Sequence, residues 1–83
     1  DLVARRGDLV VFVEVKRRAT LAAAAEAVTT TNRARVVRAA AQYRARHPEL
    51  AACTARFDAV LLAPWTAPRH VEGAWEADIG LTA

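Results

Sequence analysis

The sequence predicts an α/β protein in which a β-sheet carries one long helix on one face, in the order strand, strand, helix, strand, strand. Two observations support this fold class. Runs of β-branched and aromatic residues, typical of strands, occupy residues 9–16 and 56–63, whereas residues 30–47 repeat apolar side chains at helical spacing. The sequence contains no internal repeat and no linker, so its 83 residues are interpreted as one domain.

The first two strands are predicted to form a hairpin around a turn that contains Gly7. If residues 6–7 form a two-residue loop, Asp1 lies opposite Phe12. Cross-strand partners share a face of the sheet, as do alternate residues of one strand. Asp1 is therefore expected on the same side as Glu14 and Lys16, and a register change of one residue would turn it away.

An alanine-rich connection follows the second strand. Arg17 and Arg18 end that strand, and residues 19–28 are interpreted as a crossover with at most a short helical turn. Hydroxyl and amide side chains at residues 29–32 can cap a helix that ends near His47, before a proline.

The long helix is predicted to be amphipathic. Its apolar stripe consists of Val36, Val37, Ala40 and Tyr43. The opposite, basic face consists of Arg35, Arg38, Gln42 and Arg46. Because residues 33–46 carry five arginines and no acid, this face favours a polyanionic partner.

The third strand, at residues 56–63, is predicted to end at a segment bounded by prolines, residues 64–68. A short fourth strand at residues 69–73 and a frayed tail at residues 76–83 follow. Asp58 is interpreted as the ion-pair partner of an arginine, either Arg56 nearby or Arg33 on the helix, and His70 as a histidine that stands alone.

The composition excludes several classes of protein. The net charge is +3, and eleven of the twelve basic residues are arginines, the side chain best suited to grip phosphate. No apolar run approaches the roughly 20 residues that span a membrane, so no membrane partner is expected. The single cysteine, Cys53, excludes an internal disulfide and fits a reducing, cytoplasmic setting.

Glu14 and Lys16 lie two residues apart in an otherwise apolar strand, where an uncompensated charge would cost several kcal/mol, roughly. The carboxylates of Asp1 and Glu14, with the carbonyl of Val15, could hold Mg²⁺ or Mn²⁺. Lys16 could then orient the water that attacks a phosphodiester. Asp1, Glu14 and Lys16 are thus the candidate catalytic residues, and the alternative is an ordinary ion pair on a strand.

The sequence around these residues resembles the YraN-type family of endonuclease-like proteins, within the PD-(D/E)xK restriction-endonuclease-like superfamily. The similarity is carried by residues 1–4, 11–18, 25–29, 39–43, 46–47 and 56–60 and by the Arg-Gly-Asp turn. It implies a mixed sheet flanked by helices, distantly similar to archaeal Holliday-junction resolvases. It also implies that Asp1 is the first metal-binding acid, Glu14 the second and Lys16 the catalytic lysine, and that an N-terminal helix and the start of the first strand are missing.

These observations predict a Mg²⁺- or Mn²⁺-dependent endonuclease that acts on nucleic acid, with DNA favoured and bound without sequence preference. The truncated piece is expected to bind metal weakly or to be inactive. A non-catalytic nucleic-acid-binding module and a protein-interaction domain remain as alternatives, and an uncovered apolar patch would favour a homodimer. The predicted nucleic-acid contacts are Arg17, Arg18, Arg35, Arg38, Gln42 and Arg46.

Overall fold

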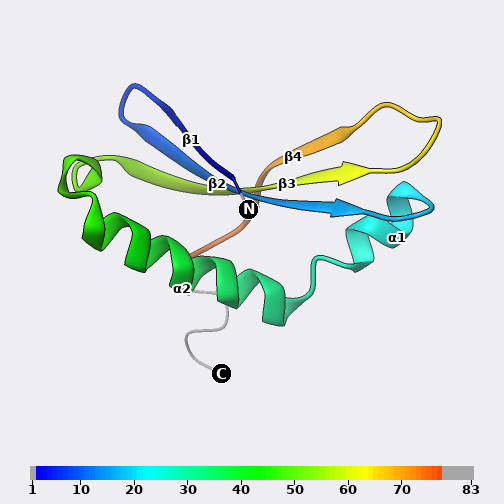
Figure 1. Cartoon of the computed structure of the whole chain (residues 1–83), viewed down its shortest axis with the longest axis horizontal. Helices are drawn as coiled ribbons and strands as arrows, with labels where there is room; N and C mark the ends of the chain where they lie inside the picture. Colours follow the sequence, from blue (N-terminus) through cyan, green and yellow to red (C-terminus); the bar gives the residue numbers. More distant parts are fainter. Residues whose placement is uncertain (1, 78–83) are drawn as a thin grey trace.

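A computed structural model describes residues 2–77 of the chain and shows a sheet covered on one face by helices (Figure 1). Within these residues the strands are β1 (Leu2–Arg6), β2 (Leu9–Arg17), β3 (Thr54–Leu62) and β4 (Arg69–Trp75). The helices are α1 (Leu21–Glu26) and α2 (Thr30–Arg46), followed by the single 3₁₀ turn η1 (Pro48–Leu50). No helix in this range is long and apolar enough to cross a membrane.

The strands of the described region form one mixed sheet in the order β1-β2-β3-β4. β2 pairs antiparallel with β1 and parallel with β3, and β4 pairs antiparallel with β3. The chain passes from β2 to β3 through both helices, a crossover that parallel neighbours require. The α/β fold class and the mixed sheet are therefore confirmed, and the apolar run of β2 is explained by its position inside the sheet.

The register of the first hairpin differs from the predicted one. Arg6 pairs with Leu9, so the loop is Gly7-Asp8 and not Arg6-Gly7. Gly7 has a φ of 59°, which glycine adopts without a side-chain clash. The shift amounts to two residues and preserves the faces, since Val3 pairs with Phe12 and Leu2 with Val13.

Both helices begin at threonine caps. The Thr20 hydroxyl accepts a hydrogen bond from the Ala23 amide at the start of α1, and the Thr29 hydroxyl accepts one from the Asn32 amide at the start of α2. An N-cap of this kind stabilises a helix by about 1 kcal/mol. The predicted caps and end of the long helix are confirmed, and the crossover contains a real, short helix.

The core lies between the helices and one face of the sheet. Alternate residues of β2, Val10 and Phe12, pack there against the buried face of α2, with Val36, Val37 and Ala40. The Phe12 ring stacks on Phe57 at a centroid distance of 5.7 Å and meets Tyr43 edge-on at 6.0 Å. The predicted apolar stripe of the helix is thus its packing face, with Tyr43 at its partly buried border.

The two tryptophans have opposite environments. Trp75, at the end of β4, is buried and stacks on Phe57 at 5.8 Å. Trp65, in the turn between β3 and β4, is fully exposed. Of the predicted tail, Glu76 and Ala77 follow β4, and residues 78–83 lie outside the described residues.

Candidate active site

Glu14 is placed by strand alternation on the helix-covered face of β2, next to Phe12. Its side chain is only 1% exposed, the highest burial of any carboxylate on this face of the described sheet. Lys16 follows on the same face and is 18% exposed. The prediction that these two charged groups share one face of a buried strand is confirmed.

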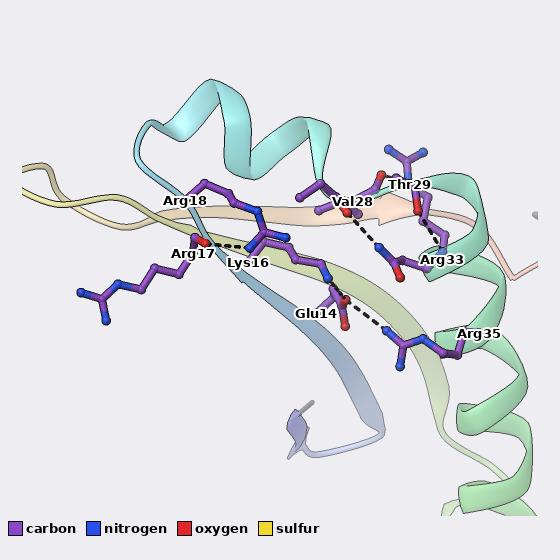
Figure 2. A network of polar contacts seen from close by, with 10 residues as sticks. Glu14, Lys16, Arg17, Arg18, Val28, Thr29, Arg33 and Arg35 are labelled. Atoms are coloured by element: carbon purple, nitrogen blue, oxygen red, sulfur yellow. Dashed lines mark hydrogen bonds and ion pairs between the residues drawn. The ribbon is translucent and has the colours of Figure 1, made fainter.

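Two cations converge on one oxygen of Glu14 (Figure 2). The Lys16 Nζ lies 3.1 Å from the Glu14 Oε2, and the Arg35 Nη2 lies 3.3 Å from the same atom. Lys16 comes from the same strand, whereas Arg35 reaches across from the first turns of α2. The carboxylate therefore connects the sheet to the helix through charge as well as packing.

Arg35 was predicted to lie on the outward basic face, and the structure gives it a second role. Its side chain is 55% exposed, so it lies at the border between solvent and Glu14. The only hint in the sequence is its position directly beside the apolar residue Val36. The direction of the Arg35 side chain depends on Glu14, a carboxylate on a strand distant in sequence. Helical periodicity cannot indicate such a contact.

The other oxygen of Glu14 is the most informative atom of the site. Oε1 is buried and has no hydrogen-bond partner among the described residues. A buried carboxylate oxygen without a partner is costly, by about 1–3 kcal/mol or more for a charged group. A divalent cation or a hydrogen-bond donor supplied from outside these residues would remove that cost.

The predicted metal ligands can be compared with the structure only in part. Asp1 lies outside the described residues. Glu14 and Val15 are neighbours in β2, with Glu14 on the helix-covered face. Among residues 2–77, no three His, Cys, Asp or Glu side chains cluster as a metal site. Within the described part of the chain, the donor that fits a hard cation is thus the buried Oε1 of Glu14, which has no hydrogen-bond partner there.

The predicted basic face of α2 is present. Arg38, Gln42 and Arg46 are exposed, as are Arg17 and Arg18 at the end of β2. Other arginines of α2 instead hold the fold together. Arg44 donates hydrogen bonds to the carbonyls of Cys53, at 2.7 Å, and Leu50, at 3.3 Å. Arg33 donates to the Val28 carbonyl.

Asp58 lies on the opposite face of the sheet, because it pairs with Val13 and not with Glu14. It is fully buried and accepts hydrogen bonds from Arg56, which binds both of its oxygens, and from the Gly73 amide. Of the two arginines predicted as its partner, Arg56 is the one that pairs with Asp58, whereas Arg33 binds the Val28 carbonyl. His70 does not stand alone as predicted, since its Nε2 lies 2.7 Å from the Asp58 Oδ2.

The pKa of Asp58 reflects these contacts. Burial acts to raise it, but the hydrogen bonds from Arg56, Gly73 and His70 and the charge of Arg56 lower the pKa from 3.8 to about 2. Gly73 has a φ of 59° and lies at an irregularity in the β3–β4 pairing. Asp58 therefore stabilises this bulge and does not belong to the Glu14 site.

Fold and site together define the class: a small α/β protein whose mixed sheet buries, in an inner strand, a carboxylate paired with a lysine and an arginine. The profile of the family described as "Uncharacterised protein family UPF0102" matches residues 1–62. The chain belongs to UPF0102, which is the YraN family, so the resemblance at the family level is confirmed.

The relatives that the chain matches include UPF0102 proteins of several bacteria. It is 63% identical over 78 residues to one from Paramagnetospirillum magneticum, covering 94% of this chain and 60% of that protein. It is 50% identical over 80 residues to one from Methylocella silvestris, covering 96% and 64%, respectively. The chain thus spans about 60% of the length of these relatives, whose names state no activity.

Proposed function

We propose that this chain is the catalytic part of a cytoplasmic, metal-dependent endonuclease of the restriction-endonuclease-like type, which hydrolyses phosphodiester bonds of nucleic acid, preferably DNA. The observation that carries the proposal is the pairing of Lys16 with Glu14, whose Oε1 is buried and has no partner within the described residues. A structural ion pair would gain stability by satisfying both oxygens. A ligand site, in contrast, needs one oxygen left available.

In this proposal Glu14 holds Mg²⁺ or Mn²⁺ through Oε1, with Asp1 and the Val15 carbonyl as further ligands. Such an ion supplies a nucleophilic water and neutralises charge that develops on the phosphate. Lys16 is held by the Glu14 Oε2, so its ammonium stays beside the ligand atom. It would stabilise the negative oxygens of the phosphate in the transition state.

Arg35 acts as a positioning residue in the same proposal. Its guanidinium contacts Glu14 and is more than half exposed, so it can hold the carboxylate in place and still approach a phosphate. The exposed Arg38, Gln42 and Arg46 continue from Arg35 along α2. They would guide a nucleic-acid backbone to the site through contacts that do not read sequence.

The test measures nicking of labelled DNA and RNA by the intact protein with Mg²⁺ or Mn²⁺. Glu14→Gln should abolish cleavage, and Lys16→Met should reduce it by about 100-fold or more, as does loss of one donor to a developing oxyanion. Glu49→Gln, which changes an exposed carboxylate on η1, is the matched control and should cleave normally. Circular dichroism confirms that each variant is folded.

A second candidate is a nucleic-acid-binding module that keeps the fold without catalysis. The exposed Arg38 and Arg46 of α2 and the arginines that end β2 favour it, because the ion pairs of Glu14 are made by Lys16 and Arg35 instead. Calorimetric titration with Mn²⁺ distinguishes the two. Metal binding that Glu14→Gln removes supports the nuclease, whereas nucleic-acid binding without any metal binding supports the module and contradicts the catalytic proposal.

A further inference from the structure

Trp65 is the most exposed large apolar side chain in the described region. Its relative exposure is 103%, compared with 58% for Leu2 and 43% for Val3. Tryptophan is rarely left in water in this way, because burial of its ring is strongly favourable. A single exposed leucine or valine needs no explanation, but this side chain does.

The backbone around Trp65 is restricted. Its φ is 64°, in the left-handed region that costs a non-glycine residue about 1–2 kcal/mol. Pro64 and Pro68 bracket the turn, and their rings restrict the backbone around the tryptophan. A turn whose backbone is already restricted loses less conformational entropy when it binds a partner.

The turn that contains Trp65 lies at the same end of the sheet as Lys16 of the proposed active site. Lys16 pairs with Leu61, and Leu61 pairs in turn with Arg69, so the three residues form one row across β2, β3 and β4. Trp65 lies four residues beyond Leu61, which limits it to about 14 Å of extended chain from this row. Figure 1 shows the β3–β4 turn at the end of the sheet where β2 finishes.

The surroundings of Trp65 are cationic. Arg17 and Arg18 end β2 next to Leu62, since Arg17 pairs with Leu62 and the Arg18 amide donates to the Leu62 carbonyl. The segments 15–25 and 59–71 contain no acid. A flat aromatic ring inside a positive surface is the combination that binds single nucleic-acid strands: cations hold the backbone and the ring stacks on a base.

We propose that Trp65 stacks on an unpaired base of a nucleic-acid strand whose backbone approaches Glu14 and Lys16. Arg17, Arg18 and Arg69 would hold the backbone of the same strand. This inference rests on the proposed function and adds a substrate class to it. The preferred substrate has at least one unstacked base, as in a single strand, a flap or a branched junction. A continuous duplex, whose bases are already stacked, gains nothing from Trp65.

The test compares binding of a fluorescein-labelled single strand and a blunt duplex to the intact protein. Trp65→Ala should weaken single-strand binding about 5- to 150-fold, the equivalent of about 1–3 kcal/mol for one stacked base. Trp65→Phe, which keeps an aromatic ring, should retain most of the affinity. Binding of the duplex should change less than two-fold, and the dependence of single-strand affinity on salt should keep its slope, because stacking releases no counterions.

Each other outcome has a defined meaning. Unchanged single-strand binding by Trp65→Ala overturns this inference and leaves the proposed function intact, whereas an absence of binding to any nucleic acid by the wild type contradicts both. The inference is also overturned if Trp65→Ala weakens binding of the single strand and of the duplex equally, or if Trp65 binds anionic vesicles in place of DNA. Failure of acrylamide to quench the fluorescence of an exposed tryptophan in the wild-type protein overturns it as well, because Trp65 would then be covered.

Discussion

Replacement of Asp58 by asparagine tests how the uncovered face of the sheet is stabilised. The carboxylate binds Arg56, His70 and the Gly73 amide at once, and its pKa is lowered from 3.8 to about 2. Asparagine can still accept from Gly73, but its amide group presents donors to a guanidinium. Asp58→Asn should therefore destabilise the protein at neutral pH.

The size of the effect follows from the pKa. A shift of almost two pKa units corresponds to about 2.5 kcal/mol at most, at about 1.4 kcal/mol per unit. Solvent screens part of this energy, because the side chains of Arg56 and His70 are 32% and 50% exposed. The expected loss is about 1–2 kcal/mol, which in a protein of this size lowers the urea midpoint by about 1–2 M.

The same reasoning fixes the pH dependence. The folded carboxylate has a lowered pKa, so its contribution is complete above pH 3.8 and is lost as the pH falls through about 2. Urea unfolding followed by circular dichroism at pH 7, 4 and 2 should show a smaller acid-dependent loss in Asp58→Asn than in the wild type. Glu72→Gln is the control, since Glu72 is 66% exposed and lies 3.5 Å from Arg56. Equal acid dependence in wild type and Asp58→Asn would refute the argument.

Two further predictions concern the bulge and the helix. Gly73→Ala should lower the free energy of unfolding by about 1–2 kcal/mol through backbone strain alone, because φ is 59° and an added Cβ would meet no atom within 4 Å. Gly73→Asn should lower it less, and urea midpoints measure both variants. Arg38→Gln should lower the slope of log affinity against log salt for duplex DNA by about 0.9, the value for one phosphate contact. The control Glu49→Gln should leave the slope unchanged. An unaltered slope for Arg38→Gln would show that this residue does not contact the DNA backbone.

The sequence was sufficient for the elements whose determinants are local. The long helix has its threonine cap and its apolar stripe within one segment, and β2 is identified by the apolar run at residues 9–13. The common face of Glu14 and Lys16 follows from strand alternation alone. For this reason the central part of the candidate site could be predicted.

Features that depend on two distant segments could not be predicted in the same way. Glycine can occupy either position of a two-residue loop, so the pairing of Arg6 with Leu9 was decided by strand contacts. The contact of Arg35 with Glu14 joins residues on a strand and a helix, and that of His70 with Asp58 crosses a bulge. None of these pairs leaves a periodic signal in the sequence.

The parallel pairing of β2 with β3 has a consequence for how the chain folds. Each hairpin, β1–β2 and β3–β4, closes over a short turn, whereas the ladder between them forms only after residues 18–53 have been looped back. Closing the longer loop costs more entropy and slows the search. We therefore expect the two hairpins to appear early and their docking, with α2 against Phe12, to limit the folding rate.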